Sequence, residues 1–552
     1  FGAVVLLLLP GEFLRRTLVG FADHNAAEPL FQATAVAAFA VALAVAQKDR
    51  PIWELVTAGD WNALRRPALW SALAGVATGL YIWVWPPGIL LIGIFAVYLV
   101  LQTVSDFGVR SPDHVAFVAV VSMVTTAAVT LLKFQEATFS PTKIGFLHPA
   151  FALVVAASAV GLAALARVFD GRTFDNDWVD QSGFGAVVST AAAAAVAVVA
   201  FLDVGVVGLI RTNLLRFVAF SANAETRTIG EAGPLLASRT AQAYGEIGVV
   251  LSQYGFTFLT ALIGAVAVLA VPLYRRKAEG DWTFLGLAAA VVVFVFAGNL
   301  AAFPDLFGGL VGVFGFDPQV TGLVVVGALV FAAAARIRYD AERLFLFVWA
   351  AFLTAAAFTQ LRFNYYLAVA VAVFNAYFLR LALGVVGVEV ADSISAPDVE
   401  NYQVIVAVAV VALVLMPVLT VPLSLGPQDV QTRTAVQASD TAPGNGFFVW
   451  DESLDWVTEN TPREGTFGGA DNELETYGQY QRPADGDFEY PDGAYGVQSW
   501  WDYGHWITTR GERIPNANPF QEGATAAANF LLAPNETAAN DVLADDDEGA
   551  GT

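Results

Sequence analysis

The chain has 552 residues, of which 57% are hydrophobic and only 14% are charged, with a mean hydropathy of +0.59. Soluble domains carry about 25% charged residues, so both a soluble globular protein and a disordered chain are excluded. The net charge of −22 also disfavours nucleic-acid binding, which requires basic residues to neutralise phosphates. A polytopic α-helical membrane protein remains.

Charge is distributed unevenly along the chain. Residues 426–552 hold 23 of the 50 acidic residues and 5 of the 28 basic ones. We therefore predict a transmembrane helical domain over residues 1–425 and a soluble domain over 426–552. The basic residues are 24 Arg and 4 Lys, and an acidic, Lys-poor surface is typical of halophilic organisms. Because the chain has no cysteine, disulfides and Cys-ligated zinc are excluded.

Apolar runs that approach the bilayer-spanning length of about 20 residues recur through the first block. After a partial run at 1–10, which we interpret as the start of a chain that lacks its true N-terminus, about twelve candidate spans follow. They lie at 29–47, 68–85, 86–104, 115–132, 149–166, 184–210, 247–274, 284–303, 319–335, 344–360, 365–387 and 402–425. Pro86–Pro87 indicates a tight turn between two of them.

Basic residues concentrate in four loops, 48–67, 167–183, 275–283 and 336–343. Counting spans places all four on one side of the membrane, which we assign to the cytoplasm by the positive-inside rule. The same count places the soluble block and a second set of loops on the outer face. These loops are 11–28, 133–148, 211–246, 304–318 and 361–364.

The outer loop before the first complete span contains Asp23-His24-Asn25, followed by Glu28. A carboxylate, an imidazole and an amide oxygen could together hold a hard divalent cation. Asp and Asn are also good N-caps of helices, and on the pattern alone a cap is the better interpretation.

Two further outer loops contain isolated charged residues. Glu231 lies in the loop 211–246, and a structureless loop of that length is uncommon and often functional, although a single acid can simply be solvated. Arg362 lies at the outer end of a span. Such an Arg usually extends toward lipid headgroups, but its planar guanidinium also suits the oxygens of a phosphate-bearing ligand.

The soluble block contains the string Trp500-Trp501-Asp502-Tyr503-Gly504-His505-Trp506. Two indoles and a carboxylate can form a small pocket, in which the carboxylate and an indole N–H bind a hydroxyl. The alternative is the aromatic core of a small domain. We favour the pocket, because Asp502 buried among aromatic rings would be a costly charge without a partner.

In this order, these strings resemble the catalytic subunit of oligosaccharyltransferases of the archaeal AglB type. Trp500–Gly504 is similar to that family's WWDYG signature, Thr228–Glu231 to its T-I-x-E motif, and Phe13–Glu28 to its second outer-loop motif. The similarity covers nearly the whole chain. It implies a GT-C type membrane glycosyltransferase that moves an oligosaccharide from a dolichyl phosphate carrier to Asn of Asn-x-Ser/Thr sequons. It further implies a cell-membrane location with the active site on the extracellular face.

The resemblance also implies a role for each matching residue. Asp23 would ligate a divalent metal, Mn²⁺ or Mg²⁺, and Glu231 would accept a hydrogen bond from the acceptor amide. Arg362 would hold the phosphate of the donor. The sequon hydroxyl would be bound by the signature residues Trp500, Trp501, Asp502, Tyr503 and Gly504.

The chain departs from the family pattern in two respects. The family usually has an acid or His two positions after the Asp, where this chain has Asn25, and the adjacent His24 could serve instead. The family's first metal-binding Asp would lie upstream of Phe1, and a further motif expected after WWDYG is not found before Thr552. We therefore expect the chain to be truncated at both ends.

Two other functions also explain parts of the sequence. Another lipid-dependent glycosyltransferase, such as a protein O-mannosyltransferase, would share the spans but not the WWDYG string. A polytopic transporter would carry charged residues near the middle of its spans. The spans of this chain are almost free of charges, and its polar residues cluster at one membrane face.

Overall fold

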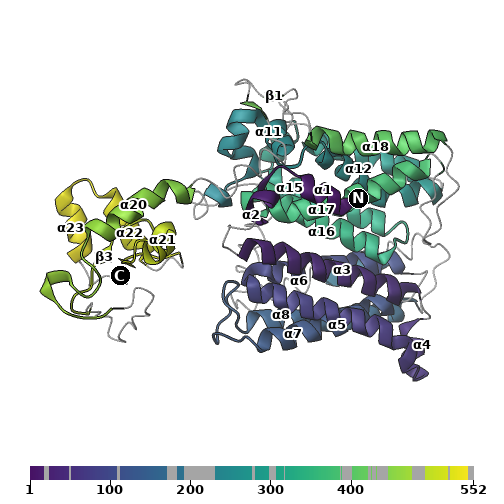
Figure 1. Cartoon of the computed structure of the whole chain (residues 1–552). Helices are drawn as coiled ribbons and strands as arrows, with labels where there is room; N and C mark the ends of the chain where they lie inside the picture. Colours follow the sequence, from purple (N-terminus) through teal and green to yellow (C-terminus); the bar gives the residue numbers. More distant parts are fainter. Residues whose placement is uncertain are drawn as a thin grey trace. The chain divides into compact units, whose positions relative to one another are not determined.

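The protein consists of two compact units, Phe1–Pro443 and Gly444–Thr552, of which helices are the main component (Figure 1). The computed structural model describes residues 1–17, 24–48, 51–107, 112–170, 183–191, 230–276, 280–296, 306–315, 318–385, 387, 401–419, 424–425, 430–431, 446–474, 491–519 and 523–544.

Within this described part, eight segments of the first unit are long and apolar enough to cross a membrane. The helices concerned are α3 (Ala27–Lys48), α5 (Trp61–Val84), α6 (Leu90–Asp106), α7 (Asp113–Leu131), α8 (Leu147–Asp170), α12 (Thr257–Arg276), α16 (Ala341–Thr359) and α17 (Asn364–Val385). Further helices of the same unit are α1 (Gly2–Leu8), α13 (Asp281–Phe296), α14 (Leu306–Val313), α15 (Pro318–Ala334) and α18 (Asn401–Leu419). The protein is therefore a multi-pass membrane protein.

The helices pack in two neighbouring groups (Figure 1). Helix α3 packs on α5, α5 on α7 and α7 on α8, and in the second group α12 packs on α17. Helix α16 contacts α3 and α6 as well as α17, and so joins the groups. The rings of Phe39, Phe95 and Phe345 fill this junction, with centroids 4.6–5.8 Å apart.

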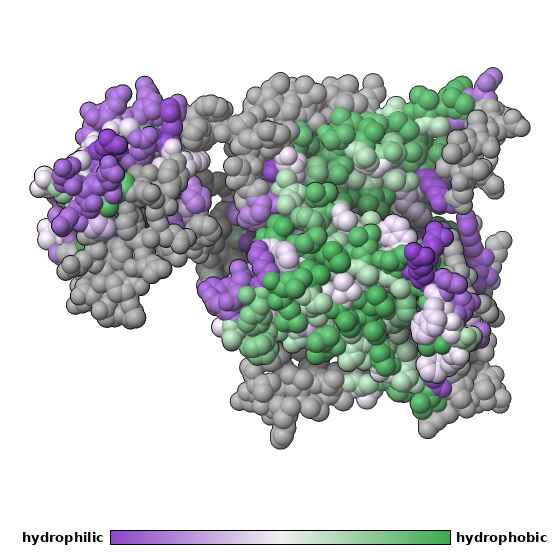
Figure 2. Space-filling view, turned by 60° about the horizontal axis from the view of Figure 1, so that its bottom comes forward, coloured by the Kyte–Doolittle hydropathy of each residue, from purple (hydrophilic) through white to green (hydrophobic). Residues whose placement is uncertain are grey.

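The outward faces of these helices are apolar. Leu69, Leu73, Val154 and Leu262 are exposed, and Figure 2 shows hydrophobic residues over much of the surface of this unit. Such a surface would be a liability in water, but it suits lipid, the apolar solvent of a membrane protein.

One predicted span, 247–274, begins too early: the span is α12, and the residues before it belong to a separate helix, α11 (Arg239–Tyr254). They are separated at Gly255, whose φ of 60° is disfavoured for residues with a Cβ. The predicted structureless loop 211–246 is corrected too, because it holds the short helices η4 (Gly230–Ala232) and η5 (Leu235–Ala237) and is helical again from Arg239. Of the predicted span 184–210, only residues up to 191 are described.

The last predicted span of the first unit also ends early. Helix α18 stops at Leu419, and β1 (Ser424–Leu425) pairs antiparallel with β2 (Val430–Gln431). Strand β1 contacts α11, which groups this hairpin with the first unit. The units accordingly divide after Pro443, C-terminal to the predicted domain boundary at residue 425.

The four basic loops meet at one end of the first unit. The guanidinium of Arg167 lies over the ring of Trp53, which belongs to α4 (Ile52–Thr57), at 4.7 Å from its centroid. Arg276 donates to the carbonyl of Arg336, and Ala341 N donates to Gln47 Oε1 at 3.1 Å. Figure 1 shows α4 at the opposite end of the bundle from α2 (Glu12–Thr17) and α11. The grouping of these loops on one side is confirmed.

The second unit is a small helical domain with one short sheet. Strands β3 (Gly496–Val497) and β4 (Ile514–Pro515) pair in parallel and enclose η9 (Trp501–Tyr503) and α21 (Gly504–Thr509). The remaining elements are α20 (Gly446–Asn460), η8 (Phe467–Gly469), α22 (Ala524–Leu532) and α23 (Glu536–Ala544). The WWDYG string thus lies in a loop whose two ends are paired.

The buried Glu464 and Arg513 fix this loop in place. Glu464 accepts hydrogen bonds from Tyr495 N at 2.9 Å and Ile514 N at 3.1 Å, one at each strand. The guanidinium of Arg513 donates to carbonyls at the end of α20 and just beyond it, those of Thr458 at 2.9 Å and Thr461 at 2.8 Å. These carbonyls would otherwise lack a partner at the helix C-terminus.

Candidate functional site

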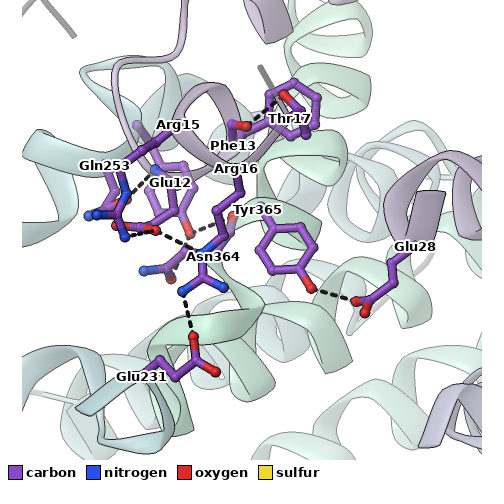
Figure 3. Close-up of polar contacts among 11 residues, drawn as sticks. Glu12, Phe13, Arg15, Arg16, Thr17, Glu28, Glu231, Gln253, Asn364 and Tyr365 are labelled. Carbon is purple, nitrogen blue, oxygen red and sulfur yellow. Dashed lines mark hydrogen bonds and ion pairs between the residues drawn. The ribbon is translucent and has the colours of Figure 1, made fainter. Parts of the chain in front are cut away.

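Four segments that are distant in sequence meet at the end of the first unit opposite the basic loops. Arg16 of α2 pairs with Glu231 of η4. Leu361 N, in η7 (Leu361–Phe363), donates to Gly233 O at 3.0 Å. Tyr365, at the start of α17, donates to Glu28 (Figure 3). The predicted outer loops 11–28, 211–246 and 361–364 are thereby brought together.

Glu231 is held at this end in an ion pair and remains accessible. Its carboxylate side chain is 45% exposed, and Oε2 accepts a hydrogen bond from Arg16 Nη2 at 2.6 Å. Arg16 Nε also donates to Glu12 Oε2 at 2.9 Å. Burial works to lower the pKa of Arg16, but the two carboxylates outweigh it and raise that pKa. Arg16 is therefore a permanent cation next to Glu231.

Glu12 is the second carboxylate of this cluster. Burial raises its pKa, but the charges and hydrogen bonds of Arg15 and Arg16 outweigh burial and hold the pKa of Glu12 below its ordinary value. Motif reading missed both Glu12 and Arg16 as site residues. The spacing of four residues within one helix could have indicated their pairing with each other, but not the pairing with Glu231.

A buried carboxylate lies beside this cluster. Glu28 is only 2% exposed; it pairs with His24 Nε2 at 2.8 Å and accepts hydrogen bonds from the hydroxyls of Tyr365 and Tyr366. Tyr366 in turn accepts from the hydroxyl of Tyr81 at 3.1 Å. Glu28 thus joins the start of α3 to the start of α17, the helix that directly follows η7.

The predicted metal site is described only in part. Asp23 lies outside the described residues, and no three His, Cys, Asp or Glu side chains gather into a metal site in the part of the chain that is described. Asn25 is buried, at 4% exposure, whereas His24 is 52% exposed. If the His24 imidazole is neutral and its Nε2 donates to Glu28, the lone pair of the ring lies on Nδ1. A carboxylate that accepts from the other nitrogen of a ligating His is common at metal sites. The chemistry of His24 therefore suits a divalent ion, and Asn25 stays a predicted ligand.

Arg362 belongs to η7, whose backbone is joined to the Glu231 segment through the bond from Leu361 to Gly233. Its guanidinium carbon lies 5.3 Å from the ring centroid of Phe363. The side chain is half-buried. Glu231, Arg362 and the His24–Glu28 pair therefore share one end of the helical unit.

Asp502 of the WWDYG string is exposed, so it is not the buried charge that the aromatic-core alternative would require. Because the carboxylate remains in water, it requires no buried partner. Trp500 Nε1 donates to Asp502 Oδ2 at 3.0 Å, and the ring centroids of Trp500 and Trp501 are 5.8 Å apart. Two indoles and an accessible carboxylate are thus neighbours.

Tyr503 and Gly504 have structural environments of their own. Tyr503 packs against Trp450 of α20, with centroids 4.4 Å apart, and against Trp506 at 5.6 Å, so an aromatic cluster accompanies the indole pair. Gly504 is buried, and a Cβ at this position would lie 2.6 Å from the carbonyl oxygen of Ala517. Packing alone therefore accounts for glycine at position 504.

Comparison with known proteins gives two family matches. The family model "Oligosaccharyl transferase STT3, N-terminal" matches residues 1–229, and "AglB core domain" matches residues 448–550. The dolichyl-monophosphooligosaccharide–protein glycotransferase AglB of Haloferax volcanii is 50% identical over 100% of the chain and 52% of its own length. The dolichyl-phosphooligosaccharide–protein glycotransferase 3 of Archaeoglobus fulgidus is 25% identical over 97% of the chain and 52% of its own length. The chain spans about half the length of these relatives.

Solved structures share the fold. One is the structure of the oligosaccharyltransferase AglB of Archaeoglobus fulgidus in complex with an inhibitory peptide and a dolichol-phosphate. The match covers 99% of the chain and 54% of the AglB chain, with a TM-score of 0.64 and 22% identity. Another is the structure of an oligosaccharyltransferase of the same organism in complex with Zn and sulfate. The match covers 100% of the chain and 52% of the chain in that structure, with a TM-score of 0.55 and 20% identity. The GT-C arrangement of membrane helices followed by a small domain is common to all of them.

Proposed function

Because the chain belongs to the AglB-type oligosaccharyltransferase family, we propose that it transfers an oligosaccharide from a dolichyl phosphate-linked donor to the Asn of Asn-x-Ser/Thr sequons. The observation that carries the proposal is the accessible Glu231 carboxylate, held by Arg16 at the end of the bundle where the His24 and Arg362 segments also lie. The activity is thus protein N-glycosylation in a lipid bilayer.

Glu231 acts on the acceptor amide in this proposal. An amide nitrogen is a poor nucleophile, because its lone pair is delocalised into the carbonyl group. A fixed carboxylate that accepts an N–H bond weakens this conjugation, and it acts best when it is already oriented and ionised. The ion pair with Arg16 supports both conditions. Asp23 is proposed as the second catalytic carboxylate of the same reaction.

The WWDYG string binds the sequon hydroxyl in this proposal. The indole of Trp500 is hydrogen-bonded to Asp502 Oδ2, which orients the carboxylate. The hydroxyl of Ser or Thr can then donate to Asp502 beside the two indole faces. Tyr503 and Gly504 support the string through packing.

The donor side requires a cation for its phosphate. Arg362 is proposed to hold the phosphate oxygens, since its guanidinium forms paired hydrogen bonds with them. A divalent ion, Mn²⁺ or Mg²⁺, is proposed at Asp23 and His24, where it would supply charge stabilisation of the departing phosphate. We place this centre and the soluble domain on the extracellular face of the cell membrane.

The proposal is tested with the full-length protein in membranes, a dolichyl phosphate-linked oligosaccharide, a fluorescent peptide with an Asn-x-Thr sequon, and Mn²⁺. We expect the wild type to shift the peptide on a gel and Glu231→Gln to lower the rate by about a hundredfold. Glu136→Gln is the matched control, because Glu136 is 43% exposed and pairs with Lys143 at 2.6 Å. We expect this variant to retain the wild-type rate.

Two results would contradict the proposal. One is the absence of transfer by the wild type, and the other is an equal rate for Glu231→Gln and Glu136→Gln. A peptide in which Gln replaces the acceptor Asn identifies the acceptor atom. Glycosylation of that peptide would instead favour an O-mannosyltransferase-like enzyme, which acts on the hydroxyl.

A further inference from the structure

We propose that Glu12 is a positioning residue for Glu231, to which it is connected through Arg16. The inference rests on the proposed function, because it assumes that Glu231 acts on the acceptor amide. It adds a residue of α2 that lies 219 positions before Glu231 in the chain. Glu12 touches neither the acceptor nor the donor in this proposal, and it acts only by fixing the guanidinium.

The geometry of Arg16 carries the inference. A guanidinium is a planar fork with fixed donor directions. Arg16 uses Nε for Glu12 Oε2, at 2.9 Å, and Nη2 for Glu231 Oε2, at 2.6 Å (Figure 3). Because both donors belong to one rigid plane, the bond to Glu12 sets the direction in which Nη2 points. Arg16 alone, on a flexible side chain, would not have that constraint.

Glu12 itself is anchored to the neighbouring helix. Its backbone N donates to Gln253 Oε1 of α11 at 3.0 Å. Arg15 Nη2 donates to the same Oε2 as Arg16, at 2.8 Å, and the ring of Tyr365 lies 5.7 Å from the guanidinium carbon of Arg16. The backbone of Glu12 is therefore held by α11, and its carboxylate is held by Arg15 as well as by Arg16.

Burial separates this pair from an ordinary surface ion pair. Exposed ion pairs contribute little, because water screens them and two long side chains must be ordered. The side chain of Arg16 is only 11% exposed and that of Glu12 is 21% exposed. Without Glu12, Arg16 would pair with Glu231 alone, whose side chain is 45% exposed. Glu12 thus fixes the direction from which Arg16 meets Glu231.

The arrangement also assigns the two oxygens of Glu231. Arg16 takes Oε2, so the acceptor amide would donate to Oε1. A change that releases Arg16 should therefore affect the orientation of Glu231, while the binding of the peptide in the second unit stays the same. This separates a positioning role from a role in peptide binding.

The test uses Glu12→Gln in the full-length protein, with the same donor, peptide and Mn²⁺. We expect kcat to fall roughly tenfold, since small misplacements of reacting groups are costly, while KM for the peptide stays the same. Glu12→Asp, which keeps the charge, should recover part of kcat.

The matched control is Asp340→Asn, which removes an ion pair with Arg343 at 2.9 Å across one helical turn, at the basic end of the bundle. This variant should match the wild type. The inference is overturned if Glu12→Gln has the wild-type kcat, if its KM for the peptide changes along with the loss of kcat, or if Glu12→Asp recovers no activity. Failure of the proposed function is distinct, because the wild type would then form no product.

Discussion

Gly504 illustrates how packing alone can determine the identity of a residue in a signature string. It opens α21 behind the indole pair, and an added Cβ would lie 2.6 Å from Ala517 O and 2.9 Å from the Cα of Asn518. Both atoms belong to the backbone, so no side chain can rotate away to make room. Asp502, two residues earlier, is exposed and interacts with Trp500, which suits a residue that meets a ligand.

We expect Gly504→Ala to lower the unfolding free energy of the second unit by about 1–3 kcal/mol, the typical cost of overpacking. Thermal unfolding followed by near-ultraviolet circular dichroism measures it, since Trp450, Tyr503 and Trp506 report on this region. Thr509→Ala, at an exposed position of the same helix, should change stability by less than about 0.5 kcal/mol. Equal stability of the two variants would show that position 504 has room for a side chain.

Glu28 is the residue on which the junction of α3 and α17 depends. We expect Glu28→Ala to destabilise the first unit by about 3 kcal/mol, because it leaves two buried tyrosine hydroxyls without their acceptor. Tyr365→Phe removes only one of these bonds and should cost about 1 kcal/mol. Thermal unfolding in detergent ranks the two variants. A larger loss in Tyr365→Phe would contradict the central position of Glu28.

At the scale of elements, the second unit depends on one helix end. Arg513 is 2% exposed and donates to carbonyls at and just beyond the end of α20, and it directly precedes β4. Glu464 joins the same strand to β3. The WWDYG string between these strands has little regular structure of its own, so its position follows from these two buried charges.

We expect Arg513→Met to destabilise the second unit by about 3 kcal/mol, because carbonyls at the end of α20 lose a charged donor. Arg513→Lys should recover only part of this, since an ammonium cannot reach several carbonyls in the geometry of a planar fork. Chemical denaturation of the full chain, followed by the tryptophan fluorescence of this unit, measures both. Full recovery by Lys would mean that charge alone is sufficient.

At the scale of the whole molecule, polar contacts gather at the two ends of the helical unit. One end holds the basic loops, with Arg167, Arg276 and Arg336 in contact with neighbouring loops. The other holds Glu12, Arg16 and Glu231. Apolar helices lie between the two ends. The basic loops at one end are the feature from which the positive-inside rule assigns the cytoplasmic side.

Because the chain has no cysteine, single introduced cysteines can determine which end faces outward. Ala137 and Ala58 are both exposed, in loops predicted on opposite sides. In intact cells, we expect a membrane-impermeant maleimide to label Ala137→Cys and to leave Ala58→Cys unlabelled until the membrane is opened. The reverse pattern would invert the topology and place Glu231 on the cytoplasmic face.

Hydropathy predicts much of this fold because a helix is the main solution for an apolar run in lipid. Hydropathy does not locate the break at Gly255, since the second half of α11 continues into α12 as one largely apolar run. The motif strings indicated Glu231, Arg362 and the indole pair. They missed Arg16 as the partner of Glu231, because that pairing spans 215 positions and depends on how helices pack.

The separation of 215 positions between Arg16 and Glu231 has a consequence for biosynthesis. At ribosomal rates of about 5–20 residues per second, Glu231 is made about 10–40 s after Arg16. The pair with Glu12 needs only one helical turn and can form at once. During that interval Glu12 is the carboxylate that balances the guanidinium, so the nascent segment need not carry a bare cation while it awaits its distant partner.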